Sequence, residues 1–229
     1  MTQQAAPRIK ICGLKDIETI EAMDGLPINE IGFVFAKSKR QVTPETAATL
    51  IEAANRLAAR GGNRPNAAGV FVDPTLEELE DILAVAPLDI VQLHGNESPG
   101  FCQMVKDRFQ VQVWKALGMK PAEHTEAAEP QSAVLRITPF KGGVDAILID
   151  SAGGGTGHTF DWETIKEYLV AARSIKLPLY VAGGLHADNV QELLNVYAPD
   201  GIDVSSGVET EGRKDIQKIR LFVRRVMEA

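Results

Sequence analysis

Cysteine and histidine are scarce in this chain of 229 residues, which has two cysteines and four histidines. Cys12 and Cys102 are too few and too unevenly placed for a disulfide framework, which fits a reducing compartment. No set of histidines, cysteines and carboxylates has the spacing of metal ligands, so we expect no metal. A GxGxxG fingerprint after the first predicted strand is also missing, which argues against a dinucleotide site. We therefore expect a protein that works without a cofactor.

Positive charge and long apolar runs are lacking as well. The formal net charge is −7, so the chain offers no broad electrostatic attraction to nucleic acid or to an anionic membrane. No window approaches ~18 unbroken apolar residues, and the opening MTQQAAPR lacks the apolar core of a signal peptide. We expect a cytoplasmic protein with neither nucleic acid nor membrane as partner. A small anionic substrate fits this charge, because backbone amides and a few arginines can hold a phosphate.

The sequence does contain a regular alternation of short apolar runs and helical stretches. The runs predict eight strands, over residues 8–12, 30–35, 66–72, 88–93, 111–116, 144–149, 177–182 and 201–204. Helices are predicted over 15–24, 97–108, 161–173, 188–197 and 215–227. Two more are expected to begin at Thr43-Pro44 and at Asp73-Pro74, and residues 118–141 predict an irregular or shortened helix.

Eight strand-then-helix units at a spacing of about 28 residues close naturally into a barrel, whereas an open doubly wound sheet usually has fewer strands. No linker rich in glycine, proline or serine divides the chain. We predict an α/β fold, a single parallel (β/α)8 TIM barrel over residues 8–229, preceded by a short extension over residues 1–7.

In such a barrel, functional residues gather just after the carboxyl ends of the strands. Asp150 ends the sixth strand and precedes the glycine-rich stretch 153–157, which is typical of an active site, although it could merely cap the loop. Cys12 ends the first strand beside Gly13, where a thiol can act as base or nucleophile if its surroundings lower its pKa from about 8.5. A packed strand-end thiol is an equally weighted alternative on the residues alone.

Two neighbouring loops predict a phosphate site. Gly183 and Gly184 follow the seventh strand, and Ser206 and Gly207 follow the eighth. Glycines let backbone N–H groups approach an anion closely, and a short helix beginning near Ser206 would point its positive end inward. Barrels often hold a phosphate at this place.

Three more polar residues stand near strand ends. Arg40 lies in the basic stretch after the second strand, and its planar fork suits a carboxylate on a substrate. His94 follows the fourth strand, where a structural role or a ligand contact is favoured over proton transfer. Asp203 lies in the eighth strand, next to the predicted phosphate loops.

Seven stretches follow one another in the order expected of a single known family. They are KICGL (10–14), GFVF (32–35) with KSKR (37–40), VQLHGNE (91–97), LIDS (148–151), GGTG through FDW (154–162), AGGL (182–185) and DVSSGVE (203–209). Together they resemble phosphoribosylanthranilate isomerase, a (β/α)8 enzyme of tryptophan biosynthesis. The resemblance runs from Arg8 to the end of the chain.

This resemblance implies an Amadori rearrangement of N-(5-phosphoribosyl)anthranilate to 1-(2-carboxyphenylamino)-1-deoxyribulose 5-phosphate. It implies that Asp150 is the general acid that opens the sugar ring to a Schiff base, and that Cys12 is the general base that removes the C2 proton. Arg40 is then expected near the anthranilate carboxylate, His94 and Asp203 beside the substrate, and the glycine and serine loops on the phosphate. A base in this role should have a lowered pKa. A monomer is the default expectation, with a dimer left open.

Several alternatives keep the barrel but change its function. A pentose-phosphate epimerase would want metal-binding histidines, and an indole-forming synthase would want a catalytic lysine, for which Lys115 is the nearest candidate. A bifunctional isomerase that also serves histidine biosynthesis is expected to carry an aspartate in place of Cys12. A barrel retained only for binding would be indicated by the loss of Cys12 or Asp150, and both are present.

Overall fold

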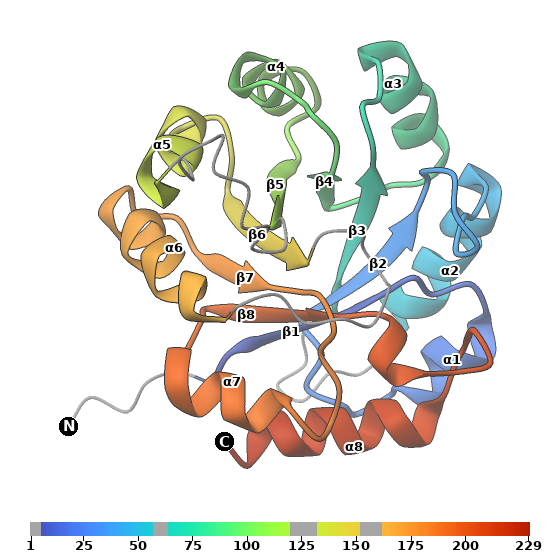
Figure 1. The fold of residues 1–229 in the computed structure, drawn as a ribbon. Coiled ribbons are helices and arrows are strands. Elements are labelled where there is room, and N and C mark those ends of the chain that lie inside the picture. Colours follow the sequence, from blue (N-terminus) through green and yellow to red (C-terminus); the bar gives the residue numbers. More distant parts are fainter. Residues whose placement is uncertain (1–5, 57–63, 120–131, 152–161) are drawn as a thin grey trace.

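The computed structural model describes residues 6–56, 64–119, 132–151 and 162–229. Eight parallel strands form a closed barrel in chain order, and the first pairs with the last to close it (Figure 1). They are β1 (Arg8–Cys12), β2 (Glu30–Val34), β3 (Asn66–Phe71), β4 (Ile90–Leu93), β5 (Gln112–Met119), β6 (Ala146–Ser151), β7 (Leu179–Val181) and β8 (Gly201–Val204). The predicted (β/α)8 barrel is confirmed.

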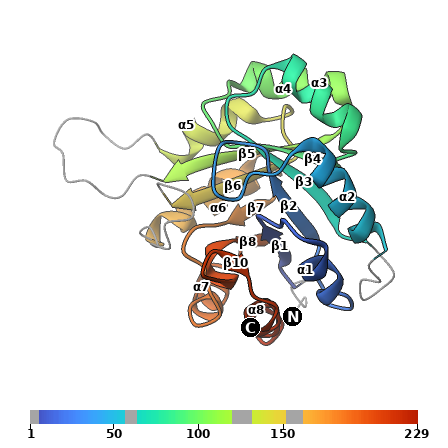
Figure 2. The same ribbon diagram turned by 90° about the vertical axis from the view of Figure 1, so that its right-hand side faces the viewer.

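Helices surround the barrel and cover its outer face (Figures 1 and 2). They are α1 (Ile17–Ala22), α2 (Pro44–Asn55), α3 (Leu76–Val85), α4 (Pro99–Phe109), α5 (Ala133–Ile137), α6 (Glu163–Ser174), α7 (Val190–Tyr197) and α8 (Ile216–Met227). The 3-10 turn η1 (Thr138–Phe140) follows α5. After β8 come a second turn, η2 (Ser206–Val208), and a hairpin of β9 (Glu209–Thr210) and β10 (Arg213–Lys214). Among the described helices, none has the length and apolar character needed to cross a membrane.

The interior of the barrel is packed with side chains, so that it is a core and not a pore. Its cluster is Ala68, Ile90, Trp114, Ala116, Ala146, Leu148, Tyr180 and Ala182. The ring centroids of Trp114 and Tyr180 lie 4.3 Å apart. A Cβ atom at Gly201 would stand 2.3 Å from the Tyr180 ring, so this position requires glycine. Arg8, at the start of β1, donates to the Tyr180 hydroxyl at 2.9 Å and covers the core at the amino-terminal end of the barrel strands.

The helix starts show where local signals were sufficient and where they competed. Helix α2 begins as predicted, with Pro44 in its first turn and Thr43 accepting a hydrogen bond from the Thr46 N–H. The predicted start of the next helix at Asp73 is wrong, because Thr75 and Glu78 form a reciprocal capping box and the helix begins at Leu76. Asp73 has a φ of 47° and accepts the N–H of Asn96 instead.

The fifth and sixth units also differ from the simple pattern. The prediction of a shortened fifth helix is confirmed by α5, which has five residues. Strands β5 and β6 pair as far as Met119 and Ser151, so Asp150 lies within β6 and not just after it. Residues 120–131, the glycine-rich stretch 153–157 and residue 161, where the sixth helix was expected to begin, lie outside the described residues.

Candidate active site

A cavity of about 300 Å³ lies at the carboxyl ends of the strands. It brings together eight of the nine residues predicted for the site: Cys12, Arg40, His94, Asp150, Gly183, Gly184, Asp203 and Ser206. The ninth, Gly207, supports the cavity from behind. Because these residues come from β1, β4, β6, β7, β8 and the adjoining loops, only the closed barrel could assemble them.

Unsatisfied polar atoms mark this cavity as a place built for a ligand. The buried atoms Gln92 Oε1, Asp150 Oδ1 and Asp203 Oδ1 have no hydrogen-bond partner among the described residues, and all three side chains line the cavity. A buried polar atom left without a partner costs about 1–3 kcal/mol, so such atoms are rare unless function requires them. A substrate rich in hydroxyl groups would satisfy them.

Asp150 is the acid of the cavity, and His94 is its neighbour. The carboxyl of Asp150 is buried, and its Oδ2 lies 3.4 Å from Nε2 of His94. The backbone N–H of His94 donates to the carbonyl of Phe71 at 2.8 Å, which fixes the loop after β4 against β3. His94 therefore lies beside the acid and forms part of the cavity wall, and its expected contact with a ligand stays a prediction.

Cys12 lies beside a buried ion pair. Lys10, on the same strand, is fully buried and donates to Oδ2 of Asp203 at 2.8 Å. Burial raises the pKa of the Cys12 thiol, Lys10 and Lys214 lower it, and Asp203 raises it again, so that the net pKa is raised. The prediction that the surroundings of Cys12 lower its pKa is therefore wrong for this structure, because desolvation of the thiolate outweighs the two cations.

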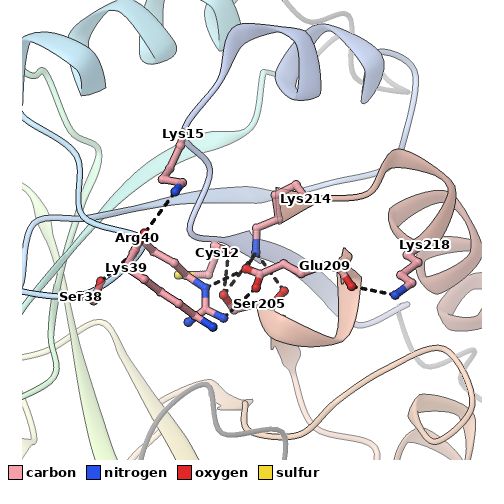
Figure 3. Close-up of polar contacts among 9 residues, drawn as sticks. All are labelled: Cys12, Lys15, Ser38, Lys39, Arg40, Ser205, Glu209, Lys214 and Lys218. Carbon is pink, nitrogen blue, oxygen red and sulfur yellow. Dashed lines mark hydrogen bonds and ion pairs between the residues drawn. The ribbon is translucent and has the colours of Figure 1, made fainter. Parts of the chain in front are cut away.

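Arg40 is held by a carboxylate of the protein itself (Figure 3). Its Nε donates to Glu209 Oε1 at 2.7 Å and its Nη2 to Glu209 Oε2 at 2.9 Å. Lys214 donates to the same Oε1 at 2.8 Å. It also donates to the carbonyl of Ser205 at 2.9 Å, and the Ser205 hydroxyl donates to the carbonyl of Cys12 at 3.0 Å. The arginine is therefore tied to the ends of β1 and β8.

The loops after β7 and β8 fit together closely. Gly183 and Gly184 have φ values of 87° and 65°, a conformation that other residues rarely adopt. A Cβ atom at Gly207 would stand 1.8 Å from the carbonyl oxygen of Leu185, so glycine is required where the turn η2 meets the loop after β7. Ser206, which begins η2, lines the cavity. The short turn expected near Ser206 is present.

The chain matches the family model described as N-(5'phosphoribosyl)anthranilate (PRA) isomerase over residues 9–225. It belongs to the phosphoribosylanthranilate isomerase family. The N-(5'-phosphoribosyl)anthranilate isomerase of Brevibacillus brevis is 46% identical over 223 residues, which cover 96% of this chain and 93% of that protein. The protein of the same name from Streptococcus mutans is 37% identical over 219 residues, with 96% and 98% covered.

Solved structures of phosphoribosylanthranilate isomerases share the fold of this chain. The structure from Thermotoga maritima is 31% identical with a TM-score of 0.76, and the match covers 97% of this chain and 100% of that one. The structure from Thermus thermophilus is 29% identical with a TM-score of 0.76, covering 96% and 98%. The predicted family, barrel and isomerase class are confirmed.

Within this phosphoribosylanthranilate isomerase family member, Lys115 has a structural place. It is 2% exposed, does not line the cavity and donates to Glu97 Oε2 at 2.7 Å and to the carbonyl of Gly95 at 2.8 Å. Glu97 in turn accepts the N–H groups of Gly95 and Asp73. The pair fastens the loop that carries His94, and the interpretation of Lys115 as a catalytic lysine loses its support.

Glu209 and Lys214 contact residues of the site but were not among the residues predicted for it. Glu209 is the last residue of the DVSSGVE stretch and Lys214 follows five residues later, yet neither had a predicted role. One sequence signal could have indicated their pairing. Glu209 and Lys214 are five residues apart on either side of Gly212, which is the spacing of residues that face one another across a tight hairpin. Among the described residues, no group of three or more histidines, cysteines and carboxylates could hold a metal ion.

Proposed function

We propose that the chain catalyses the Amadori rearrangement of N-(5-phosphoribosyl)anthranilate in L-tryptophan biosynthesis, with Asp150 as general acid and Cys12 as general base. The observation that carries this proposal is one cavity lined by an acid, a thiol, an arginine and the loops after β7 and β8. Membership of the family supports the reaction. A similar structure, 29% identical with a TM-score of 0.73, is described as a complex with reduced 1-(o-carboxyphenylamino)-1-deoxyribulose 5-phosphate.

The charges and surfaces of the cavity suggest how the substrate lies. The phosphate is assigned to the loops of Gly183, Gly184 and Ser206, supported behind by Gly207. The carboxylate of the anthranilate is assigned to Arg40. Apolar side chains such as Val34 and Val70 also line the cavity and suit an aromatic ring. His94 and Asp203 then contact the sugar.

Asp150 is assigned the first proton transfer. Its Oδ1 is buried on the cavity wall and has no partner in the described part of the chain, so it can approach the ring oxygen of the ribose. Protonation of that oxygen lets the C1–O bond break, while the lone pair of the anthranilate nitrogen forms the C=N bond of a cationic Schiff base. His94, beside Oδ2, orients the carboxyl group.

Cys12 is assigned the second transfer. Its thiolate removes the proton from C2, and the electrons of that bond form the C1=C2 double bond and neutralise the Schiff-base nitrogen. The enol then loses its hydroxyl proton while C1 gains one, which gives the ketone. The raised pKa of Cys12 is consistent with this order, because the positive charge of the Schiff base stabilises a neighbouring thiolate only after ring opening.

The test follows the fluorescence decay of N-(5-phosphoribosyl)anthranilate generated in situ. Wild type is expected to consume it rapidly, while Cys12→Ser and Asp150→Asn each lose at least ~10²-fold, the usual scale for a missing general acid or base. Cys102→Ser is the matched control, because Cys102 is buried in α4 away from the cavity. If wild type leaves the substrate untouched, the proposed reaction is wrong and another phosphosugar chemistry takes its place.

Location, domain extent and assembly complete the proposal. The two free cysteines support a cytoplasmic location. Residues 8–229 are proposed as the catalytic domain, preceded by residues 1–7. A similar structure is described as monomers generated from a dimeric Thermotoga maritima isomerase. For this chain a monomer stays the default prediction, with a dimer open.

A further inference from the structure

The pairing of Arg40 with Glu209 uses only one side of the guanidinium group. Glu209 takes Nε and Nη2, which is a side-on bidentate contact. Arginine has five N–H donors in a fixed fork, so among the described residues the Nη1 group and the second N–H of Nη2 stay available as another bidentate edge. Arg40 lines the cavity and Glu209 does not. Glu209 contacts one edge of the guanidinium group (Figure 3). Because Glu209 does not line the cavity, the remaining edge can face a ligand.

The charge balance around this pair favours an anionic ligand. Two cations, Arg40 and Lys214, surround the single carboxylate of Glu209, which leaves one net positive charge. The Lys214 side chain is 2% exposed and is held by Glu209 and Ser205, so it is not the group that meets the ligand. Of these two cations, Arg40 is thus the one that lines the cavity, together with Lys37 from the same loop.

The backbone around Arg40 keeps it in one place. A Cβ atom at Gly13 would stand 2.6 Å from Cδ of Arg40, so the arginine stem lies directly over this glycine. Lys15 donates to the carbonyl of Lys39 at 3.1 Å, and the Arg40 N–H donates to the Ser38 hydroxyl at 3.1 Å. These contacts fix the stem, and Glu209 fixes the head.

Glu209 is itself positioned by the hairpin that joins β8 to α8. Glu209 and Lys214 are directly opposite one another in the β9–β10 ladder, across a turn with φ values of 51° at Glu211 and 76° at Gly212. Lys218, in the first turns of α8, donates to the carbonyl of Glu209 at 2.7 Å. The orientation of the arginine is thereby linked to the packing of the last helix.

We infer that Glu209 is the positioning residue that directs the free edge of Arg40 toward the ring carboxylate of the substrate, and so sets the preference for a carboxylated aromatic amine. This inference deepens the proposed function and rests on it for the identity of the substrate. The chemistry that Arg40 would recognise is an aryl carboxylate bound through two parallel charge-assisted hydrogen bonds.

Binding measurements test the inference without turnover. Two probes are used. The first is reduced 1-(o-carboxyphenylamino)-1-deoxyribulose 5-phosphate, and the second is the same compound without the ring carboxylate. For Glu209→Gln, the Kd of the carboxylated probe is expected to rise about tenfold, the scale of one lost charge-assisted hydrogen bond. The Kd of the probe without the carboxylate, and the inhibition constant of inorganic phosphate, are expected to stay within about twofold.

Two further variants separate positioning from general structural damage. In an Arg40→Met background, Glu209→Gln is expected to add nothing to the loss, because the two residues act as one unit. Glu211→Gln makes the same chemical change at an exposed position of the same turn and should behave as wild type. Steady-state kinetics of Glu209→Gln should show a raised KM with kcat changed less than about threefold.

Each result decides between the claims. Equal weakening of both probes and of phosphate, additivity with Arg40→Met, or a wild-type Kd for Glu209→Gln would each overturn the inference. If the wild type binds the carboxylated probe tightly but does not consume the substrate, the proposed function is wrong. The Kd values of Glu209→Gln for the two probes then still decide whether Glu209 positions Arg40. Wild type that binds neither probe would overturn both.

Discussion

Glu209→Gln should change how the stability of the protein depends on pH in acid solution. The substitution keeps the shape of the side chain and removes its charge. In the wild type that charge accepts hydrogen bonds from Arg40 and from Lys214, and the carboxylate is only 6% exposed. After the substitution the two cations lose their shared counterion, while the backbone of the hairpin has no reason to move.

The magnitude follows from the pKa of Glu209. Burial alone raises it, but the hydrogen bonds from Arg40 and Lys214 outweigh burial and lower the pKa from 4.5 to about 2. At about 1.4 kcal/mol for each pKa unit, the ionised carboxylate contributes at most about 3 kcal/mol to the free energy of unfolding near pH 7. The folded pKa is the lower one, so this contribution is complete above roughly pH 5 and is lost as the pH falls toward 2.

The assay is urea unfolding at pH 6.5 and pH 3.5, followed by tryptophan fluorescence. Between these values the difference in the free energy of unfolding between wild type and Glu209→Gln should shrink by about 1.4 kcal/mol. Glu211→Gln, exposed in the same turn, should show no comparable change. A difference between wild type and Glu209→Gln that stays constant from pH 6.5 to pH 3.5 would refute the reasoning.

Three other predictions concern the packing and the chemistry of the site. Gly207→Ala should cost about 1–3 kcal/mol in urea unfolding and weaken inhibition by inorganic phosphate, because its Cβ would clash with the Leu185 carbonyl 1.8 Å away; unchanged phosphate inhibition would contradict this. Wild-type kcat/KM should still rise above pH 8, because the pKa of Cys12 is raised, and Cys12→Asp should lose that rise; a wild-type plateau below pH 7 would count against the thiol as base. Lys115→Met should lower stability by about 3–5 kcal/mol, because the buried charge of Glu97 loses its cation, and adding Glu97→Gln should restore much of it; equal stability of the single and double variants would argue otherwise.

Properties that depend only on the alternation of strands and helices could be predicted from the sequence. Parallel strands end at one face of a barrel, so Cys12, His94, Asp150 and Asp203 had to meet once eight strands were recognised. The start of α2 could also be predicted, because Thr43 as N-cap followed by Pro44 is a local sequence signal.

Properties that depend on distant partners could not be predicted. Arg40 and Glu209 are 169 positions apart, and nothing local to either residue indicates their pairing. The direction of the Cys12 pKa depends on a balance between burial and the charges of Lys10, Asp203 and Lys214, which only the packed barrel sets. The start of α3 was predicted wrongly because two possible capping residues, Asp73 and Thr75, are two residues apart. In the structure Thr75 is the N-cap.

A deuterium label at C2 of the ribose tests most directly whether Asp150 opens the sugar ring and Cys12 removes the C2 proton. In Cys12→Ser, proton removal from C2 becomes the slow step, so the labelled substrate should react clearly more slowly than the unlabelled one. In Asp150→Asn, ring opening becomes the slow step, so the label should make no difference. A slow labelled reaction in Asp150→Asn, with no effect in Cys12→Ser, would contradict the assignment of both residues.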